Sequence, residues 1–179
     1  LFGWLEPCHF DKEAANFLLN RAQDGVGLVL PGMQCVRDTM GRRWLWQNKK
    51  MFKELADYMV EYHKTGSKLF IQLAAGFGRS MAVAPWMVTL NNNKVLGTLA
   101  KPVIDVSYCC ASATPNRWQE DMLSRPMTVE EIHEMVDAFG KTAKLLREAG
   151  VDGVEIHAVH EGYLLDQFTI ANWNHRTDE

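Results

Sequence analysis

The sequence lacks the features that mark membrane proteins and nucleic-acid-binding proteins. No apolar run approaches the ~20 residues that a membrane-spanning helix needs, and the first residues do not follow the basic-then-apolar pattern of a signal peptide. The formal net charge is −3, which gives no electrostatic reason to bind nucleic acid or an anionic membrane. We therefore expect neither nucleic acid nor a membrane as a partner.

Cysteine pairs with metal-binding spacing are also missing. The four cysteines are Cys8, Cys35, Cys109 and Cys110, and they form no Cys-x-x-Cys motif. Structural zinc and iron–sulfur sites use such spacings. This usage is typical of reduced thiols, and we expect a cytoplasmic protein.

What is present is ordinary for a globular domain. The chain has 179 residues, of which 47% are hydrophobic and 23% charged, enough to bury a core within one domain. It does not begin with methionine, and its last residues, NHRTDE, have the character of a motif interior. We therefore expect a piece of a larger protein.

Apolar periodicity predicts helices that alternate with short strands. Asp11, Asn48 and Thr128 fit helix starts, and Thr128 forms a capping box with Glu131. The predicted helices cover residues 11–24, 48–65 and 128–149, and the predicted buried strands cover 26–30, 68–73 and 154–156. The stripe expected to be buried on the third helix is Ile132, Val136, Phe139, Ala143 and Leu146. The polar stretch 34–47 predicts a loop.

This alternation indicates parallel βαβ units. It fits a (β/α)8 barrel and a doubly wound sheet alike, but no glycine-rich dinucleotide fingerprint follows any of the three strands, and that fingerprint would favour the doubly wound fold. Residues 74–127 are long, irregular and interrupted by four prolines, which is typical of a functional insertion. A β-branched patch at 102–110 indicates a hairpin within it.

Polar residues follow the predicted strands, where a parallel barrel builds its active site. His157 and His160 come after the strand at 154–156, with Tyr163 three residues further on. From the residues alone, the histidines could bond to loops or bind a metal, although no third ligand is evident. Gln72 is an amide inside an apolar strand, where it must find hydrogen bonds. Gly32 follows the strand predicted at 26–30, where a glycine suits either a turn or the close approach of a ligand.

The run VEIHAVHEGYLLDQF (154–168), followed by NHRTDE (174–179), resembles the Old Yellow Enzyme family of FMN-dependent ene-reductases. The likeness is greatest to its bacterial branch of 2-enoate and 2,4-dienoyl-CoA reductases. It implies a (β/α)8 TIM barrel, of which residues 1–179 would be a partial domain holding about strands two to four. Residues of about 74–127 would form its long active-site loop.

The resemblance also implies roles. His157 and His160 would donate hydrogen bonds to a substrate carbonyl oxygen, where negative charge develops. Tyr163 would give a proton to the α-carbon, as a phenol with an ordinary pKa of ~10 can do at neutral pH. Gln72 would bond the flavin pyrimidine ring, and Gly32 would let the backbone approach the flavin. Arg79 and Arg176 also match family positions, and we expect them to anchor loops.

The implied reaction is reduction of an activated C=C bond next to a carbonyl, with FMN recharged by NADH or NADPH. The substrate would be a small α,β-unsaturated carbonyl compound: an enoate, an enoyl thioester or an enone. Larger members of the branch carry a 4Fe-4S cluster and FAD in later domains. The sequence does not decide whether the parent is a homo-oligomer.

The chain departs from the family pattern at two points. QLAAGFGR (72–79) stands where the family usually has QLxHxGR, and Glu161 precedes Gly162 after the histidine pair. Two other functions stay open: a metal-dependent hydrolase or lyase barrel that uses His157 and His160, and a non-catalytic fragment.

Overall fold

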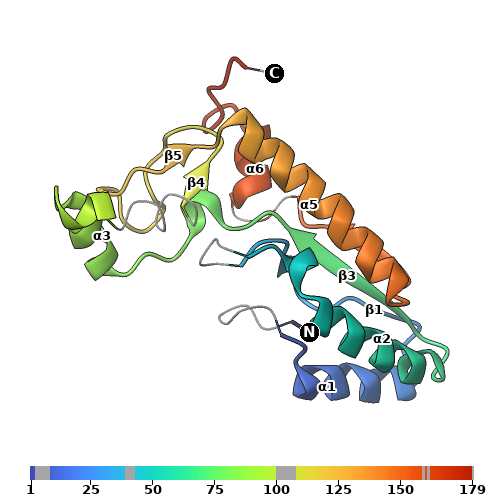
Figure 1. Cartoon of the computed structure of the whole chain (residues 1–179). Coiled ribbons are helices and arrows are strands. Elements are labelled where there is room, and N and C mark those ends of the chain that lie inside the picture. The colour runs from blue at the N-terminus through green and yellow to red at the C-terminus, as the bar shows by residue number, and fades with distance from the viewer. Residues whose placement is uncertain (3–8, 39–42, 100–107, 159, 161, 179) are drawn as a thin grey trace. The chain divides into compact units, whose positions relative to one another are not determined.

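The computed structural model describes residues 1–2, 9–38, 43–99, 108–158, 160 and 162–178 (Figure 1). Its helices are α1 (Lys12–Gln23), α2 (Lys49–His63), α3 (Pro85–Asn92), α5 (Val129–Glu148) and α6 (Leu164–Thr169), with 3₁₀ helices η1 (Leu45–Gln47) and η2 (Gly78–Ser80). Its strands are β1 (Leu28–Val29), β2 (Gln34–Cys35), β3 (Lys68–Ala74), β4 (Cys109–Cys110), β5 (Arg125–Pro126) and β6 (Gly153–Ile156).

The chain divides into two compact units. The first contains the described residues of Leu1–Asp38, Arg43–Ala74 and Met135–His157, and the second contains those of Ala75–Glu134 and Ala158–Glu179. The boundary falls at the end of β3, within α5 and after β6.

Strand β3 is the centre of the first unit. It pairs with β1, β2 and β6, and all three pairings are parallel, as the alternation of strands and helices predicts. Leu73 pairs with Gln34 of β2 on one side and with Ile156 of β6 on the other. On one face of β3, Leu69, Ile71 and Leu73 are almost fully buried, which is the period-two pattern of a strand covered on that face.

Helices α1 and α2 begin and end where the sequence predicts. The Asp11 carboxylate accepts from the Glu13 and Ala14 N–H groups, and the Asn48 side chain accepts from the Met51 N–H. Gly25 and Gly66 follow the two helices with φ values of 92° and 79°, the left-handed conformation that stops a helix. Apolar residues that recur at helical spacing on α2 are all buried: Met51, Phe52, Leu55, Met59 and Tyr62.

Three details of the first unit differ from prediction. The strand predicted at 26–30 is reduced to β1, and its side chains are not buried: Leu28 is 44% exposed. The stretch 34–47 is not only loop, because it contains β2 and η1. These elements form because β2 extends the sheet beside Leu73 and Ala74, while Leu45 packs with 0% exposure.

The third difference is the buried face of α5. Met135, Ala138, Thr142 and Leu146 are buried, whereas Val136 of the predicted stripe is 64% exposed. The predicted stripe runs on towards Ala143, which borders a surface hollow beside β6. Ala143 is only half-buried beside this hollow, and Val154 and Ile156 of β6 are partly exposed as well. Ala143 of the predicted stripe therefore borders an open side of the unit, whereas Leu146 at the end of the stripe is buried.

The second unit has less regular structure. The predicted capping box starts α5, because the Thr128 N–H donates to Glu131 at 2.8 Å and the Glu131 N–H donates to the Thr128 hydroxyl at 3.2 Å. The stretch 74–127 is not wholly irregular, since it contains α3, β4 and β5. Of the hairpin predicted at 102–110, residues 102–107 lie outside the described residues, and β4 pairs parallel with β5.

This unit contains one small apolar cluster among its described residues. Tyr108, Met122 and Val83 are its buried centre, and Met81, Met87, Val88 and Leu90 pack around it. The Tyr108 hydroxyl donates to the Met122 carbonyl oxygen at 3.0 Å. Burial raises the pKa of Tyr108 far above its ordinary value, so this phenol keeps its proton and serves the packing.

Within the part of the chain that the structure describes, no helix combines the length and apolar character that crossing a membrane requires.

Candidate active site

The carboxyl ends of β3 and β6 bring together the predicted residues of the first unit. The His157 N–H donates to the Leu73 carbonyl oxygen at 2.8 Å, so the ladder between the two strands extends to this histidine. Gln72 is the neighbour of Leu73 near the end of β3. Gly32 lies just before β2, which pairs with the last two residues of β3. Gly32, Gln72 and His157 therefore belong to the same edge of the parallel sheet.

Gln72 is held by a residue that sequence reasoning missed. It pairs directly with Glu155 across the β3–β6 ladder, so the two side chains share one face of the sheet. The Gln72 Nε2 atom donates a hydrogen bond to the Glu155 carboxylate. An ionised carboxylate only accepts, so this contact fixes which end of the amide is occupied. The amide oxygen of Gln72 is left to accept from a donor.

Gly32 has open space on its side-chain side. A Cβ atom built there would meet no heavy atom within 4 Å, and φ at Gly32 is not positive. Neither crowding nor backbone conformation among the described residues requires glycine. The space fits the close approach of another group, which glycine permits.

The second unit holds His160 and Tyr163 as a contacting pair. Their rings lie 5.2 Å apart at an interplanar angle of 87°. The Phe77 ring packs edge-on against Tyr163 at 5.1 Å. Tyr163 is therefore partly buried between two rings, an arrangement that favours one orientation of its phenol.

Asp166 holds the loop that carries these two side chains. This buried carboxylate accepts through Oδ2 from the backbone N–H groups of His160 and Gly162, each at 2.8 Å, and of Tyr163 at 3.1 Å. The sequence contained a signal that we did not use: Asp166 and Gln167 are consecutive polar residues inside the short apolar run LLDQF.

The carbonyl group of Gly162 is fixed from the other side. Gln167 Nε2 donates to it at 2.8 Å and the Ser80 hydroxyl at 3.1 Å. Glycine is required here, because φ is +78° and a Cβ atom would lie 2.7 Å from the Trp173 ring. The backbone before Tyr163 thus has its N–H, its carbonyl and its conformation constrained together. Glu161 lies outside the described residues.

Arg79 and Arg176 anchor loops of the second unit, as predicted. Arg79 Nε donates to the Pro115 carbonyl oxygen at 3.1 Å, and its guanidinium lies over the Trp173 ring. Arg176 Nη1 donates to the carbonyl oxygens of Ala111 and Met127. Both side chains connect segments that are distant in sequence.

The described cysteines, Cys35, Cys109 and Cys110, are buried. Burial raises the pKa of Cys110 to about 11. Since the thiolate is the reactive form, Cys110 is a packing residue and not a nucleophile. Cys8 lies outside the described residues.

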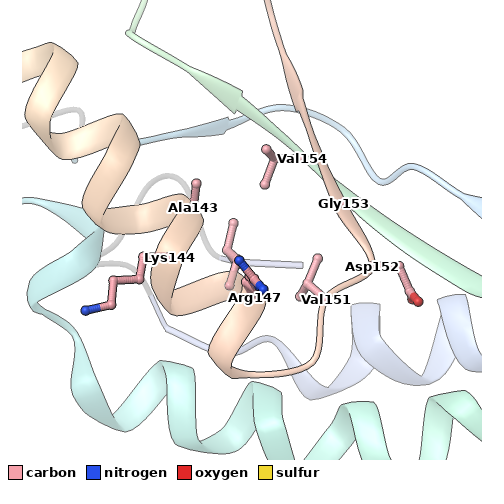
Figure 2. A pocket seen from close by; sticks show the side chains of 8 residues that line it. Ala143, Lys144, Arg147, Val151, Asp152, Gly153 and Val154 are labelled. Atoms are coloured by element: carbon pink, nitrogen blue, oxygen red, sulfur yellow. The ribbon is translucent and has the colours of Figure 1, made fainter.

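A surface hollow lies elsewhere in the first unit, between α5 and β6 (Figure 2). Its lining comes from Ala143, Lys144, Leu146, Arg147 and residues 151–154. These residues precede or begin β6, whereas His157 follows the strand's other end. Catalytic residues of parallel barrels sit at carboxyl ends, so this hollow is not the candidate active site.

Comparison with known proteins places this geometry in a family. The chain matches the model of the NADH:flavin oxidoreductase / NADH oxidase family over residues 6–179. Cinnamate reductase of Clostridium sporogenes is 38% identical over 177 residues, which are 95% of this chain and 24% of that protein. Aldehyde reductase FrzD of Cladobotryum sp. is 35% identical over 159 residues, which are 86% of this chain and 37% of that protein. The chain thus spans well under half the length of these relatives.

Solved structures show the fold. The Old Yellow Enzyme homologue of Zymomonas mobilis has a TM-score of 0.67 at 22% identity, over 96% of this chain and 45% of that chain. Old Yellow Enzyme of a Pichia species has a TM-score of 0.68 at 23% identity, over 95% and 43%. The parallel strands and helices of this chain are therefore part of a (β/α)8 barrel. The chain belongs to the NADH:flavin oxidoreductase / NADH oxidase family, that of the Old Yellow Enzymes.

Proposed function

We propose that this chain is part of an FMN-dependent reductase that acts on an activated C=C bond next to a carbonyl, with NADH or NADPH as electron donor. The observation that carries the proposal is the 38% identity to cinnamate reductase across nearly the whole chain. Cinnamate has a C=C bond conjugated to a carboxylate. Enoates therefore lead the candidate substrates, ahead of enoyl thioesters and enones.

The strand ends of the first unit fit FMN. Gln72 offers an amide oxygen, because Glu155 occupies its nitrogen, and a ring N–H of the flavin is a suitable donor to it. Gly32 offers open space beside the backbone. When bound, FMN supplies the hydride chemistry, and the protein supplies binding and orientation.

His157 and His160 are proposed to bind the substrate carbonyl oxygen. Negative charge develops on that oxygen as the C=C bond is reduced, and fixed hydrogen-bond donors stabilise it. His157 is held by the β3–β6 ladder and His160 by the loop bound to Asp166. Backbone hydrogen bonds of this kind position donors before the substrate arrives, which is the source of their catalytic effect.

Tyr163 is proposed to protonate the substrate α-carbon. Its ring is held between those of Phe77 and His160, so its hydroxyl is presented from a restrained position. A carbon base in this reaction is strong enough to take a proton from a phenol. Tyr163 is thus the general acid of the scheme.

The proposal assigns the rest of the barrel, and any 4Fe-4S and FAD centres, to parts of the parent protein beyond this chain. It also places the parent in the cytoplasm, a compartment that keeps cysteines such as Cys35, Cys109 and Cys110 reduced. The stretch 74–127 would be its active-site loop.

Cofactor analysis of the full-length protein tests the proposal. We expect it to purify with about one non-covalent FMN per chain, released on denaturation and identified by chromatography. The described residues contain no group of three or more His, Cys, Asp or Glu placed to hold a metal. Finding no flavin, but a stoichiometric metal that depends on His157 and His160, would replace the reductase by a metal-dependent hydrolase or lyase.

Replacing both histidines separates their role from that of the cofactor. The His157→Ala, His160→Ala protein should keep its flavin and still be reduced by NAD(P)H. Its alkene reduction should fall by at least the ~10²–10³-fold that one lost oxyanion donor costs. Normal alkene turnover in this variant would remove the histidines from the scheme.

A further inference from the structure

Asp166 binds the loop that carries His160 and Tyr163 of the candidate site. Its side chain is buried, with 2% exposure. Its Oδ2 atom accepts from the N–H groups of His160, Gly162 and Tyr163. His160 and Tyr163 carry the two side chains of this unit that the proposed function uses.

This arrangement exceeds the needs of a helix cap. The bond from the Tyr163 N–H to Asp166 belongs to the capping box at the start of α6, and a capping box satisfies one such donor. The bonds from His160 and Gly162 lie outside the helix. One oxygen atom of the Asp166 carboxylate therefore binds the backbone N–H groups of both His160 and Tyr163.

The same loop is fixed a second time at Gly162. Its carbonyl oxygen accepts from Gln167 and Ser80, and the Trp173 ring fills the space beside its α-carbon. A rotation of the backbone between His160 and Tyr163 would break hydrogen bonds on both sides. The direction of the Tyr163 side chain is therefore determined by buried groups beneath it.

This hydrogen-bond network lowers the stability of the folded state at two of its atoms. Asp166 Oδ1 and Gln167 Oε1 are buried, and among the described residues they have no hydrogen-bond partner. A buried polar group without a hydrogen-bond partner destabilises the folded state. Retaining two such atoms on one short helix is expected where the other atoms of the same side chains are needed.

We propose that Asp166 is a positioning residue for the reaction: it sets the directions of the His160 and Tyr163 side chains through their backbone N–H groups. This inference rests on the proposed function of those two residues. Asp166 itself touches neither the substrate nor the cofactor. Its removal therefore affects the step with the alkene and leaves FMN binding, through Gln72, intact.

Hydrogen exchange tests the positioning directly, without any activity measurement. In the FMN-loaded full-length protein, Asp166→Ala should lose amide protection in the peptide covering residues 158–166. The peptide covering β3 should keep its protection. Asp137→Ala is the matched control, because Asp137 is an exposed carboxylate on α5, and it should change neither peptide.

Transient kinetics test the consequence. Asp166→Ala should slow flavin reoxidation by the alkene by ~10–100-fold, because misplacing a reacting group by about 1 Å can cost ~10²-fold. Flavin reduction by NAD(P)H and the FMN dissociation constant should stay within a few-fold of the parent protein. Asp166→Asn keeps an acceptor oxygen of the same shape, and it should recover most of the lost rate.

Two results would overturn the inference. The first is unchanged protection of residues 158–166 in Asp166→Ala. The second is equal loss of FMN binding and of both half-reactions, which marks a merely structural role. Tyr163→Phe, measured in parallel, keeps the two proposals apart. If it leaves the alkene step unchanged, the proposed role of Tyr163 fails, while hydrogen exchange still decides whether Asp166 orders the loop.

Discussion

The two units of the chain are ordered by different interactions. In the first unit, a parallel ladder on β3 combines with the apolar faces of α1, α2 and α5. In the second unit, single buried polar side chains bind the backbone of segments far apart in sequence. The first pattern repeats along the chain, whereas the second depends on individual residues.

Asn116 is the clearest case of the second pattern. It is 1% exposed. Its Nδ2 atom donates to the carbonyl oxygens of Arg79 and Met81, each at 2.9 Å. Its Oδ1 atom accepts from the N–H groups of Trp118 and Gln119 at 2.9 and 3.1 Å. One amide thus satisfies four backbone groups across two segments of the long irregular stretch.

This difference bears on where function can reside. Apolar packing distributes stability over many contacts, as on the buried face of α2. Buried polar side chains that hydrogen-bond to the backbone of two segments fix a loop in one conformation through few atoms. The second unit can therefore hold His160 and Tyr163 in defined directions without a long helix or strand to carry them.

The largest effect is expected from the packing of the first unit. Leu55 is fully buried on α2, and Leu55→Ala should lower the free energy of unfolding by about 2–5 kcal/mol. Chemical denaturation measures it. Val60→Ala on the same helix is the control, since Val60 is 64% exposed. A loss at Leu55 no greater than at Val60 would break the comparison.

A smaller effect with a sharper location is expected at Asn116. Asn116→Ala removes four hydrogen bonds to backbone groups, and we expect a loss of roughly 1–3 kcal/mol, the range for buried groups left unsatisfied. Hydrogen exchange should accelerate at residues 78–82 and 115–123 and stay unchanged in α2. Asn92→Ala, at an exposed asparagine of α3, should have no such effect. Acceleration spread evenly over both units would show that the two are not ordered separately.

The smallest effect concerns Asp152 at the amino-terminal side of β6. Burial raises its pKa, but hydrogen bonds from Lys68, the Leu69 N–H and His63 outweigh burial and hold the pKa below its ordinary value of 3.8. A carboxyl group whose pKa is lowered in the folded state stabilises the protein at pH values above its ordinary pKa. The contribution is lost as the pH falls through the lower folded-state pKa.

Because Lys68 and His63 are largely exposed, Asp152→Asn should cost only roughly 0.2–1 kcal/mol at neutral pH. Urea unfolding at pH 7 and in acid measures the change, and the difference from the parent protein should shrink in acid. Asp137→Asn, whose partner Lys141 lies 3.5 Å away on exposed α5, should cost less. A penalty at Asp152 that grows in acid would contradict the sign of this pKa shift.

Most of the first unit could be predicted from the sequence, because apolar periodicity and helix caps reflect the packing and the hydrogen bonds that order this unit. Asp11 and Asn48 start helices of this unit as expected. The prediction that the strand at 26–30 is buried was wrong. An apolar run shows which side chains could be buried, but it does not show whether another element packs over them. Leu28 of β1 and Val136 of α5 are exposed for that reason.

The second unit was predicted poorly for a physical reason. Asn116, Asp166 and Gln167 act through hydrogen bonds to backbone groups that are close in space, and such bonds leave no period in a sequence. The resemblance named His157, His160, Tyr163, Gln72 and Gly32, but not the groups that hold them. Glu155 could have been found by register, because it lies opposite Gln72 once β3 and β6 are aligned.

One crossed measurement tests the central claim that the strand ends hold the cofactor while the Tyr163 loop serves the alkene. FMN affinity and both half-reactions are measured by titration and stopped flow in Gln72→Ala and Tyr163→Phe. We predict that Gln72→Ala weakens FMN binding. Tyr163→Phe should leave FMN binding and flavin reduction unchanged and slow reoxidation by the alkene by ~10²-fold or more, the scale of a lost general acid. If Tyr163→Phe slows both half-reactions equally, or neither, the account is contradicted.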